Sequence, residues 1–238
     1  KVSDTDTPQG ILLVLEERCT ELAALRERSE LLVVVLDGVQ DPGNAGTIVR
    51  TADAAGADAV VCLEDTIDVF SAKAVRASMG SVFHVPVVRN VSRTALCEFL
   101  QQGRVRLLAA DLDEAAQPYY AADYSGRLAL AFGNEGNGVS DEVRRMAEAK
   151  LFIPMFGKAE SLNVATAAAL VLYEAAGVRR ALAARKGRQK ESLMSRVERV
   201  TKKKEAATRL SPFHMRSLCV EREEGRYRLS LIAPRKAE

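Results

Sequence analysis

The sequence predicts an α/β fold in which a parallel sheet is flanked by helices. Short apolar runs alternate along the chain with segments of helix-forming composition, which is typical of consecutive strand–helix–strand units. The first of these runs, Leu31–Leu36, is continuously aliphatic, as expected of a strand buried on both faces. Three of the runs end in loops of Gly, Asn, Ser and Glu, and α/β folds place their binding sites at such strand ends.

The elements of this central part follow from hydrophobic pattern and from start and stop residues. After Leu31–Leu36, the expected strands are Ala59–Leu63, Val82–Val88, Val105–Ala110, Arg127–Phe132 and Leu151–Pro154. The expected helices between them are Asn44–Ala55 (closed by Gly56), Ser71–Met79, Arg93–Gln101, Ser140–Ala147 and Leu162–Ala176. Ser140 is expected to cap its helix, with Asp141 and Glu142 in the first turn.

The two ends of the chain differ from the centre. The expected order at the start is a linker, a short strand and a helix, over residues 1–10, Ile11–Leu15 and Glu16–Glu30. After Gly177, a helix-compatible segment precedes a pattern typical of a β-hairpin, over Arg179–Leu210 and then Ser217–Glu223 with Arg226–Ile232. We therefore divide the chain into a leading segment (1–30), a central domain (31–177) and an extension (178–238).

Charge is distributed unevenly along the chain. The net charge is +2, but residues 1–180 carry 18 Lys+Arg against 25 Asp+Glu, whereas residues 181–238 carry 16 against 7. A mildly acidic body with a strongly basic tail indicates an anionic partner that the tail contacts. The alternative is a solvated tail without a binding role, and both interpretations stay open.

Composition excludes several classes of protein. With 47% hydrophobic and 28% charged residues, the chain is of ordinary globular composition. No apolar run reaches the roughly 18 residues of a membrane helix, and no secretion signal is visible, so we expect a reducing, cytoplasmic setting. The cysteines lack a CxxC pair and the histidines lie far apart, so we expect neither a metal site nor a disulfide framework.

The first polar loop lies in Leu36–Thr51 (LDGVQDPGNAGTIVRT). Its proline and glycines predict a tight turn, and the helix that follows would direct its first backbone N–H groups into the loop, where an anion could bind. Arg50 could reach a phosphate or carboxylate with its guanidinium. The structural alternative is an ordinary turn with a surface Arg50 that pairs with Asp53 or Asp37.

The second polar loop lies in Leu130–Ser140 (LAFGNEGNGVS). Gly133 and Gly136 would let a ligand approach the backbone closely. Glu135 could pair with Arg50 or hold a substrate hydroxyl or amine, and the alternative is a turn with a solvated Glu135. The glycine spacing is not that of a dinucleotide-binding fingerprint.

The third polar loop lies in Phe152–Val164 (FIPMFGKAESLNV). Ser161 could act as the N-cap of the alanine-rich helix that follows. Asn163 is expected in the first turn of that helix, where Asn is a poor helix former, so a functional role is favoured. The small residues of the helix would let it lie close to another backbone, in the same chain or in a partner.

Together these loops resemble the three motifs of the SpoU-type (TrmH-like) RNA methyltransferases of the SPOUT superfamily. The resemblance runs from about Thr7 to Gly177 and rests on N-A-G-T-I-V-R, G-N-E-G and S-L-N-V. It implies a C-terminal deep trefoil knot, S-adenosylmethionine as cofactor and a homodimer. The implied reaction is methyl transfer to a ribose 2′-hydroxyl of RNA, with 23S-like rRNA as the first expectation and tRNA as the second.

The resemblance also implies roles for individual residues. The expected cofactor-binding residues are Gly133, Ile153, Leu162, Ala110 and Asn134. The expected catalytic residues are Arg50, Asn44, Glu135, Ser161 and Asn163. Because a guanidinium stays protonated in proteins, Arg50 is expected to clamp the phosphate and ribose, fixed by Glu135 and Asn44, while the proton leaves through water or phosphate.

Two other functions stay open at this point. One is a non-catalytic, knotted RNA-binding protein, which the five catalytic residues disfavour, and the other is a SPOUT base methyltransferase. Members of the resembled family often carry a small RNA-binding domain before the catalytic one, and residues 1–30 look like the linker after such a domain. The basic extension is expected to add RNA contacts through phosphates.

Overall fold

The computed structural model describes residues 20–113, 115–209, 217–223 and 226–232. The chain divides into two compact units, residues 1–181 and 182–238. The expected linker over residues 1–10 and the strand Ile11–Leu15 lie outside the described residues. Where a helix over Glu16–Glu30 was expected, the described part forms only a short 3₁₀ helix, η1 (Leu22–Glu27), whose first turn has no side-chain cap.

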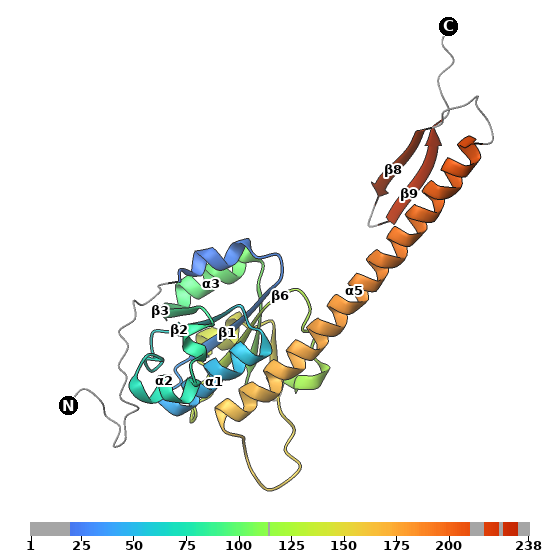
Figure 1. Cartoon of the computed structure of the whole chain (residues 1–238). Helices are drawn as coiled ribbons and strands as arrows, with labels where there is room; N and C mark the ends of the chain where they lie inside the picture. The colour runs from blue at the N-terminus through green and yellow to red at the C-terminus, as the bar shows by residue number, and fades with distance from the viewer. Residues whose placement is uncertain (1–19, 114, 210–216, 224–225, 233–238) are drawn as a thin grey trace. The chain divides into compact units, whose positions relative to one another are not determined.

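The first unit is built on a seven-stranded, all-parallel sheet in the order β3-β2-β1-β6-β4-β7-β5 (Figure 1). The strands are β1 (Leu31–Asp37), β2 (Ala59–Leu63), β3 (Val87–Val91), β4 (Arg106–Ala110), β5 (Gln117–Pro118), β6 (Arg127–Gly133) and β7 (Ala149–Phe152). The helices are α1 (Pro42–Ala55), α2 (Ala72–Ser78), η2 (Ser81–Phe83), α3 (Arg93–Gly103), η3 (Tyr119–Ala121), α4 (Asp141–Met146) and the first part of α5 (Val164–Arg209), whose later residues belong to the second unit. The predicted parallel α/β fold is confirmed.

Helices cover both faces of this sheet, which explains the aliphatic run of β1. Alternate side chains of β1 pack with α1 and α5 on one face, namely Leu32, Val34 and Leu36. The others pack with η1, α3 and α4 on the opposite face, namely Leu31, Val33 and Val35. Each such buried aliphatic side chain stabilises the fold by about 1.5–3 kcal/mol relative to exposure, so this strand anchors two cores at once.

The structure corrects the expected elements at four places. The strand expected over Val82–Val88 is wrong in its first half, where Ser81–Phe83 forms a 3₁₀ turn and β3 begins only after Pro86, which has no N–H for the sheet. The strand expected over Leu151–Pro154 starts two residues earlier. The short strand β5 was not expected. Gly177 does not end a helix, because α5 runs through it without a break.

The second unit contains the hairpin that the sequence predicts. Strands β8 (Ser217–Glu223) and β9 (Arg226–Ile232) pair antiparallel, from Ser217 opposite Ile232 to Glu223 opposite Arg226. The turn residues, 224–225, lie outside the described residues.

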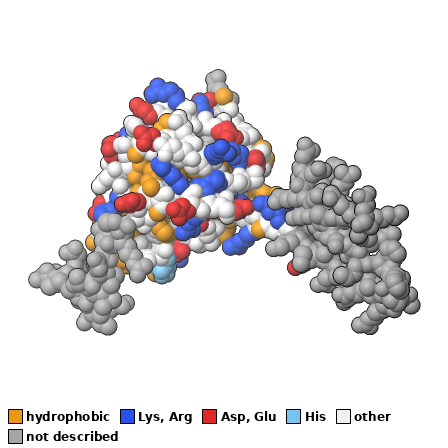
Figure 2. All heavy atoms as spheres, turned by 90° about the horizontal axis from the view of Figure 1, so that it is seen from above, with side chains coloured by type: hydrophobic (Ala, Val, Ile, Leu, Met, Phe, Trp, Pro, Cys, Tyr) orange, Lys and Arg blue, Asp and Glu red, His pale blue; other side chains and the backbone are white. Residues whose placement is uncertain are grey.

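Acidic and basic side chains are interspersed on the surface of the first unit. Figure 2 shows Lys and Arg side chains next to Asp and Glu side chains over the visible face, with apolar side chains between them. Among the described helices, none is long and apolar enough to cross a membrane.

One glycine fixes the distance between α1 and α2. A Cβ atom on Gly46 would lie 2.3 Å from the Ala74 carbonyl oxygen and 2.7 Å from the Ala77 Cβ. Real Cβ atoms do not approach backbone this closely, so the two helices could not pack at their present distance with any other residue at position 46.

We therefore predict that Gly46→Ala lowers the free energy of unfolding by about 1–3 kcal/mol, because the added methyl overpacks the α1–α2 contact. Gly177→Ala is the matched control, since that glycine lies inside α5 with no atom within 4 Å of its would-be Cβ. Helix propensity predicts a gain of about 0.5–1 kcal/mol for the control. Urea denaturation measures both, and equal effects of the two substitutions would contradict the close-contact argument.

Candidate active site

The pairing of β1 with β6 brings the first two polar loops together. These strands are in register along their whole length, from Leu31 opposite Arg127 to Asp37 opposite Gly133. Both strands end at the same level, so the loop after β1 and the loop after β6 leave the carboxyl edge of the sheet side by side. This is the edge where open α/β sheets bind their ligands.

The loop after β6 is closed by its own backbone and by Asn134. Asn134 and Gly138 exchange two backbone hydrogen bonds of 2.8 and 2.9 Å. The Asn134 side chain accepts hydrogen bonds from the N–H groups of Gly136 and Asn137 and donates one of 3.0 Å to the Gly38 carbonyl. The side chain of this predicted cofactor-binding residue therefore shapes the loop.

Gly133 and Gly136 differ in how closely their neighbours approach. A Cβ on Gly133 would lie 2.0–2.2 Å from the backbone of Gly138 and Val139, so the close approach that demands glycine is that of the loop itself. A Cβ on Gly136 would meet only the Asn134 Oδ1, at the ordinary distance of 3.5 Å. Packing alone thus requires Gly133 and leaves Gly136 free to vary.

Glu135 accepts hydrogen bonds from the start of α1. Its carboxylate receives the Asn44 Nδ2 at 2.9 Å and the backbone N–H groups of Gln40 and Asp41 at 3.2 Å each. Burial alone would raise the pKa of Glu135, but these donors outweigh it and hold that pKa below its ordinary value. Glu135 is therefore an ionised acceptor at neutral pH. Its side-chain partner is Asn44, and not Arg50, which the sequence had offered as an alternative.

The third loop meets the other two through Asn163. Asn163 Oδ1 accepts hydrogen bonds from the N–H groups of Ala165 (2.9 Å) and Thr166 (3.3 Å), so Asn163 caps α5. The structural alternative, in which Ser161 caps this helix, does not hold, because the helix begins at Val164. Asn163 Nδ2 also donates to the Asn44 Oδ1 at 2.9 Å. One chain of side-chain hydrogen bonds thus joins Asn163, Asn44 and Glu135.

A cavity of about 530 Å³ opens beside this chain, between the loops that follow β4, β6 and β7. Its lining includes all five predicted cofactor-binding residues together with Glu135, Ser161 and Asn163. Its size lies within the range of about 300–1,000 Å³ that small-molecule sites occupy. Arg144 also lines the cavity and neutralises Asp111, which leaves the carboxylates of Glu135 and Glu160. Apolar walls and these two carboxylates suit a cofactor with an aromatic base and a positive charge, so the residues present fit S-adenosylmethionine.

Arg50 lies apart from the cavity. Its side chain is exposed on α1 and does not line the cavity wall. The alternative partners considered for Arg50 are engaged elsewhere, because Asp37 pairs with Arg93 and Asp53 with His84. In the part of the chain that the structure describes, the Arg50 guanidinium thus faces solvent.

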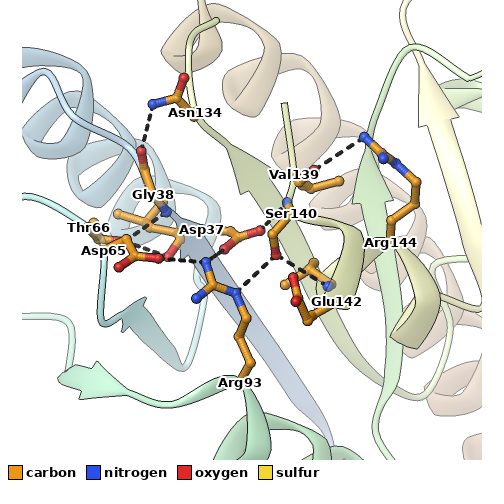
Figure 3. Close-up of polar contacts among 12 residues, drawn as sticks. Asp37, Gly38, Asp65, Thr66, Arg93, Asn134, Val139, Ser140, Glu142 and Arg144 are labelled. Atoms are coloured by element: carbon orange, nitrogen blue, oxygen red, sulfur yellow. Dashed lines mark hydrogen bonds and ion pairs between the residues drawn. The ribbon is translucent and has the colours of Figure 1, made fainter. Parts of the chain in front are cut away.

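Three ion pairs at this edge were not predicted from the sequence. Asp111, directly after β4, accepts a 2.6 Å hydrogen bond from the Arg144 Nε and lines the cavity. Arg93 at the start of α3 contacts Asp37 and Asp65 at 2.9 Å each (Figure 3). Asp37 and Asp111 could have been found from the sequence, because each is a polar residue directly after a predicted buried strand. That signal led only to the three glycine-containing loops.

Over the described residues, no group of His, Cys, Asp and Glu is arranged to hold a metal ion.

Comparison with known proteins agrees with this geometry. The model of the SpoU rRNA methylase family matches residues 31–173. The chain is 43% identical over 176 residues to the 23S rRNA (guanosine(2553)-2′-O)-methyltransferase RlmP of Bacillus subtilis, over 74% of this chain and 68% of that protein.

Solved structures of similar fold include the SpoU methyltransferase AviRb from Streptomyces viridochromogenes, with a TM-score of 0.65 and 33% identity over 70% of this chain and 66% of that one. They also include an AdoMet-bound rRNA methyltransferase from Sinorhizobium meliloti, with a TM-score of 0.64 and 40% identity over 67% of this chain and 61% of that one. The chain thus spans between 61% and 68% of these three proteins. With its central sheet, its three loops and the matched family model, the chain belongs to the SpoU rRNA methylase family.

Proposed function

We propose that this chain transfers a methyl group from S-adenosylmethionine to a ribose 2′-hydroxyl of RNA, with 23S-type rRNA as the first substrate class. The observation that carries the proposal is a cavity lined by the second and third polar loops, with the Asn163–Asn44–Glu135 chain linking both to the first loop. Relatives whose names state 23S rRNA 2′-O-methylation, RlmP and RlmB, support the same reaction and substrate.

In this proposal the cavity binds the cofactor. Gly133, Ile153 and Leu162 contribute backbone groups and apolar contacts, and Ala110 and Asn134 line the same walls. When bound, S-adenosylmethionine supplies a methyl group that is activated by its positive sulfur. The carboxylates around the cavity favour such a positive charge.

The polar residues position the RNA ribose. Positioning a hydroxyl in line with a reactive methyl group supplies a large part of the rate in such a transfer. Glu135 orients Asn44, and Asn163 orients it from the other side, so the two amides and Ser161 form the proposed contact surface for the ribose. Arg50 stays cationic and binds the adjacent phosphate.

We further propose a homodimer, in which a second copy covers the mouth of the cavity. The side chains around one surface hollow beside the cavity include Tyr120, Phe156, Leu162 and Leu170, which are exposed, with Phe156 at 96%. An exposed apolar patch of this kind favours a protein partner. In such a dimer, the solvent-facing Arg50 could bind the RNA phosphate at the site of the second copy. Light scattering of the purified chain tests the proposal, and a monomer at micromolar concentration would contradict it.

The finer features of the fold belong to this proposal as well. The sheet order, with β6 between β1 and β4 and β7 beyond β4, is compatible with the deep trefoil knot of the SPOUT fold. We propose residues 31–177 as the methyltransferase domain, close to the matched 31–173, and residues 178–238 as a basic extension. An rRNA substrate would place the enzyme in the cytoplasm.

The reaction is tested by incubating the chain with labelled S-adenosylmethionine and unmethylated rRNA or tRNA, followed by nuclease digestion and mass analysis of the nucleosides. Ribose-methylated nucleosides from rRNA support the proposal. A methylated base would instead identify a base methyltransferase. Absence of cofactor binding in calorimetry would favour the non-catalytic RNA-binding alternative.

Arg50→Ala should lower turnover by about 10²-fold or more, because the phosphate loses the cation that positions it. The affinity for S-adenosylmethionine in calorimetry should not change, since Arg50 does not line the cavity. Arg145→Ala is the matched control, because Arg145 is an exposed arginine on α4 with only a 3.9 Å contact to Glu142. Turnover of Arg50→Ala within about threefold of wild type would remove this role, since a positioning contact is worth far more.

The basic extension is proposed to contact RNA phosphates. Replacing Lys202, Lys203 and Lys204 by Gln should flatten the dependence of log K on log salt by about 0.7 per lost phosphate contact. Filter binding of rRNA from 50 to 300 mM salt measures this slope, and deletion of residues 185–238 should reduce it further. Unchanged RNA affinity at low salt would reject a role of the extension in binding.

A further inference from the structure

Arg93 connects three segments at the carboxyl edge of the sheet. Its Nη2 donates to the Asp37 Oδ1 and to the Asp65 Oδ2, both at 2.9 Å, and its Nε donates to the Ser140 Oγ at 3.1 Å. Asp37 ends β1, Asp65 follows β2, and Ser140 caps α4. Figure 3 shows the guanidinium between these three side chains.

Asp37 completes this arrangement from inside the core. Its side chain is only 1% exposed, and that of Arg93 is 25% exposed. The second carboxylate oxygen of Asp37 accepts the Ser140 backbone N–H at 2.6 Å. Ser140 is therefore held twice, through its N–H by Asp37 and through its hydroxyl by Arg93.

The segment that Ser140 ends is the loop that carries Glu135. At the start of this loop, Asn134 is bound to the Gly38 carbonyl, and at its end Ser140 is bound to Asp37 and Arg93. Glu135 lies between these two fixed points and reaches the N–H groups of Gln40 and Asp41. The same segment, residues 133–138, forms one wall of the cavity.

Arg93 also acts on the opposite side of Glu135, through the segment after β2. The backbone carbonyl of Asp65, whose side chain Arg93 binds, accepts a hydrogen bond of 2.5 Å from the Gln40 Nε2. Gln40 in turn presents its N–H to Glu135. One guanidinium thus steadies both the loop that bears Glu135 and the loop that Glu135 contacts.

We propose that Arg93 is a positioning residue, which sets the place of Glu135 without contacting the substrate. This inference rests on the proposed methyl transfer for its consequence in turnover. Neither Arg93 nor Asp37 lines the cavity, so the effect must pass through the loop.

The role requires the shape of arginine. A guanidinium presents donors in a fixed planar fork, whereas a lysine ammonium is a single point of charge. Arg93→Lys therefore leaves a cation to pair with Asp37 or Asp65, so the fold is retained. It cannot also hold the Ser140 hydroxyl from a second, differently directed nitrogen.

The first measurement is hydrogen exchange of the full-length chain. Arg93→Lys should speed exchange of the amides in residues 134–140 by about tenfold, because their hydrogen bonds open with the loop. Arg106→Lys is the matched control: Arg106 is 28% exposed, binds the carbonyls of Asp123 and Ser125, and stands at the amino end of β4. Unchanged exchange in residues 134–140 of Arg93→Lys would overturn the proposal.

The second measurement separates positioning of Glu135 from a general loss of stability. With unmethylated 23S rRNA, Arg93→Lys should lower kcat about tenfold and leave the KM for RNA within about twofold, as expected for a residue that does not bind substrate. In a Glu135→Gln background, Arg93→Lys should have no further effect on kcat, since its action passes through Glu135. Additive losses, or a raised KM for RNA, would overturn the proposal.

The two measurements also separate this inference from the proposed function. If wild-type chain transfers no methyl group to RNA, the proposed function fails, and hydrogen exchange still decides whether Arg93 holds the loop. If methyl transfer is found and exchange in the loop does not respond to Arg93→Lys, only the positioning role fails.

Discussion

The full-length parallel pairing of β1 with β6 is the constraint on which the site depends. It ends with Asp37 opposite Gly133, so the two loops that follow begin as neighbours. A slip of one residue would move one loop by about 3.3 Å along the strand. The Glu135 contacts to Gln40 and Asp41 are only 3.2 Å long, so such a slip would break them. It would also exchange the side chains of β1 between the two cores, each of which is packed around its own set.

The hydrogen bonds of Glu135 restrict what this residue can do chemically. A general base works best when its pKa lies near the working pH, and the donors around Glu135 move its pKa in the opposite direction, below the ordinary value. Its carboxylate is also occupied by the Asn44 side chain and by two backbone N–H groups. Glu135 is thus suited to hold Asn44 and α1 in place, and in the proposed methyl transfer the proton of the ribose hydroxyl needs another acceptor.

Much of the fold could be predicted because its strands are buried on both faces. Ala59–Leu63 matches β2 residue for residue, and Leu31–Leu36 matches β1 except for Asp37. The Val82–Val88 run failed because its valines are interrupted by Pro86, and the pattern of valines hid the 3₁₀ turn at Ser81–Phe83.

Site residues could be predicted where they lie together in one short segment of the sequence. Residues whose contacts join distant segments could not be predicted. The three loops could be recognised from the glycine and asparagine residues that follow a predicted strand. The helix was expected to start at Leu162 and starts at Val164, and this shift of two residues moves the cap position from Ser161 to Asn163. Arg93 could not be found at all, because its partners Asp37 and Ser140 lie 56 and 47 residues away and meet it only in the folded sheet.

The direction of the polar chain follows from the start of α5. The first N–H groups of that helix require an acceptor, so the oxygen of Asn163 must face them and its NH₂ must face Asn44. The Asn44 oxygen must then accept from Asn163, and the Asn44 NH₂ must donate to Glu135, whose ionised carboxylate can only accept. The orientation of both amides, which atom positions alone leave ambiguous, is therefore dictated by a helix cap at one end and an ionised carboxylate at the other. Reversal of either amide would place two donors or two acceptors against each other, so the rim of the cavity has one stable arrangement.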